Sequence, residues 1–411
     1  LMRALKKSQG FHHLSWSILA QRYGPIVGLK LGQVGVVLVA SPEMVRKVGS
    51  NPHLQGRPDG FFYRLRANFG RGGDLLFYFI FIDRLTVFFY KILFGNEVMG
   101  DLIEKEAEIL LEWIGSAQGK PLLMERPFEI SVVNILWAML AGKRYEPYID
   151  YIILQSFRLS DMSGGLLNQL PFLRFVAPKF CGYAAMKLNM AVISAFLQKT
   201  INEHKASRRP GEVRDLIDAI LEDMVRGNKE TNFSDNDLYC ICLDFLQAGM
   251  DTTSNTLSFF VLYMIMYPDA QKKMQQEIDR VVGRERVPKL EDRDKMPYTT
   301  ALIMEVQRLS NIAPGGVAHR ATQDTELGGY TIPRDCPLSD DCRVLPYRRR
   351  KCVGEVLAKA NVFVFATSLF QVFSVAAPDG TEKLRYEIRD GVTLCPKPYR
   401  AQWTRRIQTS Q

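Results

Sequence analysis

The sequence predicts a mainly α-helical fold with a small β region, in a single domain that spans residues 1–411. Two observations lead to this prediction. Apolar residues recur at helical spacing in most of the long segments, whereas strand-like alternation occurs near the two ends of the chain. The 411 residues are 47% hydrophobic and 24% charged, which is typical of a globular protein with a large buried core.

The N-terminal elements are predicted from turn and cap signals. Residues 25–40 alternate as two strands on either side of Gly32–Gln33, which predicts a β-hairpin. Ser41 is a favoured N-cap residue and Pro42 a favoured first helical residue, so a short helix is expected to begin there. Further helices are expected over residues 104–113, 127–141 and 184–205, the last followed by a polar loop at 206–211.

The longest predicted element is a helix over residues 235–267. Ser234 and Asp237 give it a capping-box-like start, and Pro268 ends it. At about 1.5 Å per residue it would be roughly 50 Å long. It is apolar almost all round, so we expect it to cross the middle of the protein. Helices over 268–282, 298–309 and 361–373 follow, and then a closing β-hairpin over 384–405 that turns at Asp390–Gly391.

Charge and cysteine content narrow the classes of function. Lys and Arg outnumber Asp and Glu by 53 to 44, and the net charge of +9 suits an acidic partner or an anionic membrane surface. Basic residues do not alternate with aromatic ones in a stripe, so nucleic acid is not expected as a partner, although a basic nucleic-acid or membrane-surface binder stays an alternative. The seven cysteines are irregularly spaced, which argues against a disulfide framework.

The most membrane-like stretch is residues 75–94. Asp83 and Arg84 lie at its middle, where a bilayer would make charge costly, so a buried helix is expected there. The chain begins at Leu1 and not at Met, from which we expect that an N-terminal segment, including any membrane anchor, precedes it.

One thiol stands out from the other cysteines. Cys352 directly follows four cations, residues 348–351. Neighbouring positive charge favours the thiolate. A thiolate is a metal ligand, and in some haem enzymes it is the axial one. Residues 346–355 are therefore the strongest candidate for a redox centre.

Polar residues interrupt the long central helix at residues 248–253. Glycine within a helix costs about 0.8–1 kcal/mol relative to alanine. The hydroxyl of a threonine such as Thr252 can bond back to the carbonyl four residues earlier and bend the helix. Such a notch could hold water and small ligands, as dioxygen activation requires, or it could be a buried polar cluster whose groups satisfy one another. The residues alone leave both interpretations open.

Four motifs occur in order: A-G-x-D-T-T at 248–253, E-x-x-R at 305–308, His319–Arg320, and a basic segment with Cys-x-Gly at 352–354. This ordered set resembles the cytochrome P450 family, and the resemblance extends over nearly the whole chain. The sequence is most similar to insect microsomal members near the methyl farnesoate epoxidases. The resemblance implies the cytochrome P450 fold, with the long central helix over a haem. It also implies a haem-thiolate monooxygenase that inserts one oxygen atom from O2 into an apolar substrate.

The resemblance also implies roles for single residues. Cys352 would be the proximal thiolate on the haem iron. Asp251 and Thr252 would form the catalytic acid–alcohol pair that relays protons to bound oxygen. Glu305 and Arg308 would brace the fold behind the haem. The other cofactor-binding residues would be Ala248 and Gly249 on the distal face, His319 and Arg350 at the propionates, and Gly354 beside the thiolate.

Partners and location are implied in the same way. A flavin-containing cytochrome P450 reductase would deliver electrons from NADPH, and O2, a small apolar substrate and a membrane surface would be the other partners. The substrate would be a sesquiterpenoid ester such as methyl farnesoate, with a xenobiotic as the alternative. The expected location is the cytosolic face of the endoplasmic reticulum membrane.

The chain departs from the family pattern in three places. The glycine of the family's haem loop is replaced by Arg348. Only 47 positions separate Glu305 from Cys352, which points to a deletion near residues 337–343 that removes a P-E-R-F-like segment. The family's W-x-x-x-R motif is absent from its expected helix. These departures carry an alternative function: a degenerate cytochrome P450-like protein, or an incomplete gene product, with weak or no haem binding and no activity.

Overall fold

The computed structural model describes residues 11–31, 34–58, 64–65, 98–144, 167, 170, 172–227, 233–340, 352–380, 384–389, 391 and 393–406. The predicted hairpin turn at Gly32–Gln33, the apolar stretch 75–94, Arg348 and Arg350 lie outside these residues.

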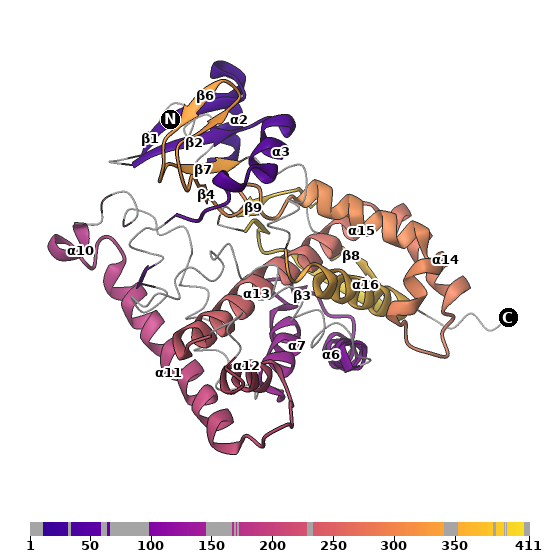
Figure 1. Ribbon diagram of the computed structural model, residues 1–411. Coiled ribbons are helices and arrows are strands. Elements are labelled where there is room, and N and C mark those ends of the chain that lie inside the picture. Colours follow the sequence, from indigo (N-terminus) through magenta and orange to yellow (C-terminus); the bar gives the residue numbers. More distant parts are fainter. Residues whose placement is uncertain are drawn as a thin grey trace.

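Helix α13, Asp235–Met266, crosses the middle of the protein, as the sequence predicts (Figure 1). The predicted capping box is present, because Ser234 Oγ accepts from the Asp237 N–H at 3.2 Å and the Asp237 carboxylate accepts from the Ser234 N–H at 2.7 Å. Pro268 begins the next helix, α14. The most extensive helix contacts of α13 are with α7 (Glu129–Ala141), α16 (Glu355–Val372) and α15 (Pro297–Ser310).

The other helices lie around this centre. Figure 1 shows α11 and α12 toward one end of α13 and α14, α15 and α16 toward the other. These helices are α2 (His12–Tyr23), α3 (Pro42–Ser50), α6 (Val98–Ser116), α10 (Leu173–Val176), α11 (Tyr183–Ser207), α12 (Leu216–Val225) and α14 (Pro268–Val281), with 3-10 turns η1 (Pro52–Leu54) and η3 (Leu290–Lys295). Most of the long ones match the predicted ranges, whereas α2 and α12 were not predicted.

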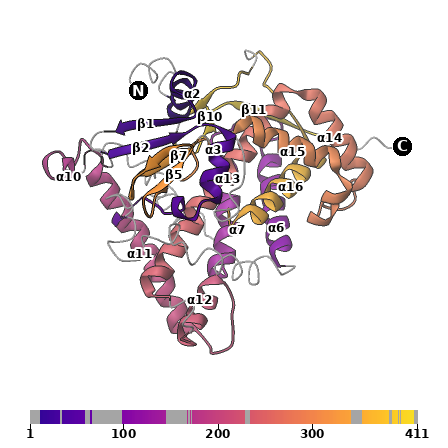
Figure 2. The ribbon, with the colours of Figure 1, turned by 45° about the horizontal axis from the view of Figure 1, so that its top comes forward.

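The predicted N-terminal hairpin is the edge of a four-stranded sheet with the order β1-β2-β7-β4 (Figure 2). Strand β1 (Ile26–Leu31) pairs antiparallel with β2 (Val34–Val39). Strand β7 (Pro337–Asp340) runs parallel to β2, and β4 (His319–Arg320) pairs antiparallel with β7. The chain between them forms the hairpin β5 (Thr325–Leu327) and β6 (Tyr330–Ile332). The residues at the predicted deletion therefore keep regular sheet pairing as far as residue 340.

The prediction of one closing hairpin over 384–405 is wrong in its second half. Strands β9 (Ile388–Arg389) and β10 (Cys395–Pro396) do form a short antiparallel pair around the expected turn. Strand β11 (Arg400–Arg405) instead pairs with β3 (Leu122–Leu123) and β8 (Phe373–Ala376). The pairing continues past Pro396, since the Lys397 N–H donates to the Glu387 carbonyl at 2.9 Å, and it ends before Pro398, which has no N–H for a ladder. Strand β11 then buries Ala401 and Trp403 in the main core.

Helix α16 combines a length and a mean hydropathy that would allow it to cross a membrane, and in the described part of the chain no other helix does. Its residues are nevertheless 72% buried inside the protein, as in a core helix. Helix α16 packs against α13, α6 and α14, and its buried phenylalanines belong to the main hydrophobic core. It begins six residues before the predicted start at Asn361, which places its first turn next to Cys352.

Candidate functional site

The thiol of Cys352 lies at the start of α16 and is exposed. Gly354 is the N-cap residue of this helix, and the N–H of Glu355 donates to the carbonyl of Cys352 at 3.4 Å. The amino end of a helix carries a partial positive charge, which favours a thiolate over a thiol. The fold thus adds a second source of positive potential to the basic residues that precede Cys352 in the sequence. A thiolate here could ligate a metal.

The polar notch of α13 is open on one face. Ala248 is exposed, and Asp251 and Thr252 are partly exposed, whereas every residue from Thr253 to Met264 is buried. Positions 248, 251 and 252 share a face at helical spacing. The predicted back-bond is present, since the hydroxyl of Thr252 donates to the carbonyl of Ala248 at 2.9 Å. The polar groups have partners within the protein, as the first interpretation expects, and the partial exposure of Asp251 and Thr252 leaves room for a ligand, as the second expects.

Arg126 adds a contact that the sequence analysis missed. Its Nη1 lies 3.4 Å from Asp251 Oδ1 and 3.4 Å from Glu129 Oε1. Glu129 is fully buried, whereas Asp251 is 31% exposed, so the guanidinium joins an interior carboxylate to one at the notch. The backbone of Arg126 has φ 53°, a left-handed conformation that is uncommon outside glycine. Arg126 lies 125 positions from Asp251, and no local signal in the sequence links the two.

Gly249 is placed by packing. A Cβ at this position would lie 2.8 Å from Leu136 Cδ1 and 2.9 Å from Leu136 Cδ2, on helix α7. The glycine therefore permits the close approach of α7 to α13. That it also lines a distal haem face stays a prediction. Ala248, its neighbour, is the residue that opens to solvent.

His319 on β4 is buried, and its Nδ1 lies 3.0 Å from the carbonyl oxygen of Leu54. A carbonyl only accepts, so Nδ1 carries a hydrogen. Contact of Nε2 with a carboxylate, such as a haem propionate, would then require a doubly protonated ring. The predicted propionate role of His319 therefore requires that its ring be doubly protonated. Arg350, the other residue predicted at the propionates, lies outside the described residues.

Glu305 and Arg308 form the pair that their spacing predicts. Arg308 donates from Nε and Nη2 to the two carboxylate oxygens, each at 2.7 Å, and this contact lowers the pKa of Glu305. The side chains are 50% and 66% exposed, so solvent screens their charges and the pair adds little to stability. That the pair braces the fold behind a haem stays a prediction.

Comparison with known proteins gives a consistent result. The family model for cytochrome P450 matches residues 2–339 and 349–403. Farnesoate epoxidase of Bombyx mori is 34% identical over 451 aligned positions, which cover 97% of this chain and 90% of the relative. The probable cytochrome P450 303a1 of Drosophila melanogaster is 32% identical, with 90% and 84% covered. Human cytochrome P450 2J2 is 29% identical, with 94% and 86% covered.

The same comparisons bear on the short spacing before Cys352. The alignment with the Bombyx mori relative has 451 positions, which exceeds the 411 residues of this chain by 40. The relative therefore carries at least 40 residues inside the aligned region that this chain lacks. The family match is interrupted over residues 340–348, beginning at the last residue of β7. This interruption overlaps the deletion predicted near 337–343.

The contact between Gly249 and Leu136 can be tested with two neighbouring substitutions. Gly249→Val should lower the free energy of unfolding by about 1–3 kcal/mol, because the new methyl groups overpack α7 against α13. Ala248→Val, one residue earlier but exposed, should cost only the helix propensity of valine, about 0.5 kcal/mol. Urea unfolding of both variants followed by circular dichroism measures the difference, and equal losses would contradict the assigned packing.

Proposed function

The chain is a member of the cytochrome P450 family, and we propose that it is a monooxygenase that uses a haem held by Cys352 to insert oxygen into an apolar substrate. Members of the family bind haem through a cysteine thiolate and receive electrons from NADPH through a reductase. One observation carries the proposal for this chain. The exposed thiol of Cys352 begins a helix that packs against α13, and α13 is open to solvent at Ala248.

When bound, the haem would supply the iron that activates dioxygen. The residues of this chain would supply the ligand, the space and the protons. The Cys352 thiolate would hold the iron, and the small side chain of Ala248 would leave room on the opposite face. Gly354 would lie beside the thiolate, because a Cβ at this position would be in ordinary contact with Cys352 Sγ at 3.9 Å.

Proton delivery would be the task of Asp251 and Thr252. The Asp251 carboxylate reaches solvent and can therefore exchange protons with water. The Thr252 hydroxyl donates its own hydrogen to the Ala248 carbonyl, so its oxygen is free to accept one from a water or an acid at the notch. Arg126 would position the carboxylate without touching the reacting atoms. Protons would thus enter along the open face of α13.

The substrate that we propose is a sesquiterpenoid ester, with epoxidation of methyl farnesoate as the reaction. The similarity to farnesoate epoxidase of Bombyx mori, at 34% identity and 97% coverage of this chain, supports it. A xenobiotic is the alternative substrate. Incubation of the reconstituted protein with methyl farnesoate, reductase and NADPH, followed by mass spectrometry, distinguishes an added oxygen atom from no reaction.

A membrane surface is the proposed docking partner, and the segment around α10 supports it. Phe175, Val176 and Phe180 are 75–80% exposed, and Phe172 and Leu188 are at least half exposed. Cations accompany them: the Arg174 guanidinium lies 4.5 Å from the Phe175 ring, and Lys179 and Lys187 are exposed. Apolar side chains interspersed with cations suit an anionic lipid surface. We therefore propose attachment to the cytosolic face of the endoplasmic reticulum membrane.

The ligand role of Cys352 is tested by haem uptake. The purified chain supplied with hemin should bind it and, when reduced under CO, give the absorption of a thiolate-ligated haem. Cys352→Ser should lose that absorption because the alcohol is a far weaker iron ligand. Cys336→Ser, a half-buried thiol beside β7, is the matched control and should keep it. A chain that takes up no haem would instead support the degenerate form of the family.

Asp251→Asn tests the proton relay. Product formation should fall about 100-fold or more, in the range of general acid–base effects, while haem content stays constant. Arg126→Gln should cause a smaller loss, because it removes only the partner that positions Asp251. Asp294→Asn, at an 89% exposed side chain, is the control and should be without effect. An unimpaired Asp251→Asn protein would remove this residue from the mechanism.

The membrane contact is tested with Phe175→Asp and Phe180→Asp combined. Each lost phenylalanine should remove about 1.5–3 kcal/mol of burial in the bilayer, so the double variant should bind about 100-fold more weakly or worse. Sedimentation with vesicles of phosphatidylcholine and phosphatidylserine measures it. Leu123→Asp, an exposed leucine on β3, should bind like the unchanged protein. Equal weakening by the control would show that net charge, and not this segment, determines binding.

A further inference from the structure

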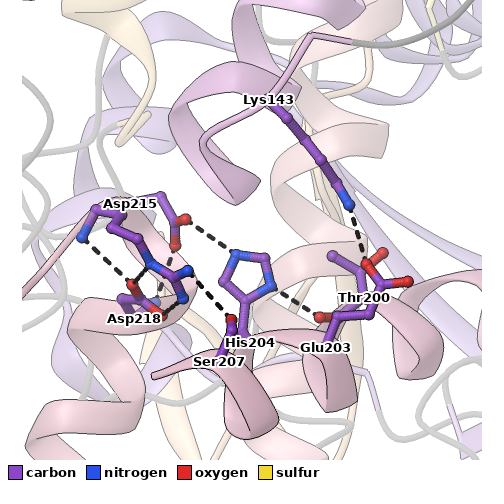
Figure 3. A network of polar contacts seen from close by, with 8 residues as sticks. Lys143, Thr200, Glu203, His204, Ser207, Asp215 and Asp218 are labelled. Carbon is purple, nitrogen blue, oxygen red and sulfur yellow. Dashed lines mark hydrogen bonds and ion pairs between the residues drawn. The ribbon is translucent and has the colours of Figure 1, made fainter. Parts of the chain in front are cut away.

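A buried ionic cluster joins the end of α11 to the start of α12, away from Cys352 and the notch of α13 (Figure 3). His204 lies in the last turn of α11, and Asp215 is the N-cap residue of α12. The side chains of His204 and Asp215 are 7% and 2% exposed. Neither residue has a role in the proposed oxygen chemistry, so their burial needs another explanation.

Both ring nitrogens of His204 face acceptors. Nδ1 lies 2.8 Å from the carbonyl oxygen of Thr200, and Nε2 lies 2.9 Å from Asp215 Oδ2. A backbone carbonyl cannot donate, so Nδ1 carries a hydrogen. A second hydrogen must then lie between Nε2 and the carboxylate, since two lone pairs would otherwise meet at 2.9 Å.

The surroundings favour that hydrogen on the imidazole, with Asp215 ionised. Asp215 Oδ1 already accepts from the N–H of Asp218 at 2.9 Å, as a charged N-cap does. Burial alone lowers the pKa of His204, but the hydrogen bonds to Asp215 and Thr200 and the charge of Asp215 outweigh it, so that the pKa is raised above its ordinary value of 6.5. The geometry and the direction of the shift together favour a protonated, buried His204 beside an ionised Asp215.

The charged and titratable groups around this pair come from four elements. Asp218 is bound by Arg214, which donates from Nη2 to Oδ1 at 2.9 Å. Burial alone would raise the pKa of Asp218, but the hydrogen bonds and charge of Arg214 outweigh it. The pKa is therefore lowered overall, and the carboxyl group is ionised. On α11, Glu203 pairs with Lys143, the residue after the α7 C-cap, at 3.0 Å. On α13, burial and the nearby charge of Asp215 raise the pKa of the Cys242 thiol, which is neutral.

The end of α7 leaves room for the carboxylate of Asp215. Gly142, the C-cap of α7, has φ +64°, and a Cβ there would lie 2.9 Å from Asp215 Oδ2. Only glycine meets both requirements, a left-handed backbone and a close carboxylate. Atoms of His204, Asp215 and Asp218 that could ligate a metal lie within 4.8 Å of one another. These atoms already make hydrogen bonds within the protein, and Arg214 donates to the carboxylate of Asp218. A proton on His204 therefore accounts for the geometry without a metal.

We propose that protonated His204 is a pH-sensitive clamp between α11 and α12, which opens when the ring loses its proton as pH rises. The closed clamp holds the α12 cap and the end of α11 on the carboxylate of Asp215, and the end of α7 packs beside it at Gly142. After deprotonation, the Nε2 lone pair faces a buried anion. Because the folded state binds this proton more tightly than the unfolded chain, the added stability is complete below the ordinary pKa. It is lost as pH rises through the folded-state pKa.

The clamp is tested on the purified 411-residue chain, with or without haem. Histidine labelled with carbon-13 gives one NMR signal for each of the five histidines, and His204→Gln identifies the signal of His204. We expect its titration midpoint above 6.5 in the unchanged protein and a lower midpoint in Asp215→Asn. Asparagine caps helices as well as aspartate does, so α12 should stay folded in that variant. Glu203→Gln, one residue from His204, is the control and should move the midpoint much less.

Hydrogen exchange of residues 216–225 reports whether the clamp holds α12. Relative to the unchanged protein, His204→Gln should lose protection at pH 6, whereas the two proteins should converge above the His204 midpoint. A midpoint at or below 6.5, a midpoint that Asp215→Asn leaves in place, or equal protection at all pH values would overturn the clamp. Protection that depends on added Zn²⁺ or Mn²⁺ would overturn it as well, in favour of a metal site.

Discussion

The burial of α13 on all sides over residues 253–264 is the constraint on which the rest of the structure depends. A helix without a polar face cannot be oriented by solvent, so specific contacts must orient it. Gly249 lets Leu136 of α7 approach the backbone, and the Tyr399 hydroxyl donates to the Ser258 carbonyl at 2.7 Å from another side. Ser254, Thr256 and Ser258 bond back to carbonyls of their own helix, which satisfies their hydroxyls inside the core. The open turn at Ala248 therefore has a fixed direction.

What could be predicted from the sequence depends on how far apart the interacting residues lie. Ser41, Ser234 and Pro268 act on the turn next to them, and the helices that they begin were predicted nearly to the residue. The partners of β11 lie far away in the chain, so a local hairpin was the simplest prediction and was wrong. For the site, the ordered motifs predicted roles for Cys352, Asp251 and Thr252, and these stay predictions. Arg126, in contrast, became visible only once the chain had folded around α13.

The interruption of the family match before Cys352 separates two well-packed parts of the fold. Strand β7 keeps its register with β2 and β4 up to the point where the match stops. Helix α16 begins at Glu355, three residues after Cys352, and is buried in the main core. The sheet and the core are thus held by contacts that do not involve residues 341–348. Glu305 and Arg308, by comparison, contact each other at an exposed surface, where solvent weakens their attraction.

The contrast between the two ion pairs explains why only one of them suits control by pH. Water surrounds Glu305 and Arg308, so either charge is solvated if its partner is lost, and neither titrates near neutral pH. An ordinary histidine titrates near neutrality, the contacts of His204 raise its pKa from there, and Asp215 beside it is buried. Loss of one proton therefore leaves a buried carboxylate without its counter-ion, which is costly. Helix α11 has His204 near its end, and the exposed apolar residues around α10 lie just before its beginning. A proton lost at His204 would thus loosen the far end of the helix that follows the segment we place at the membrane.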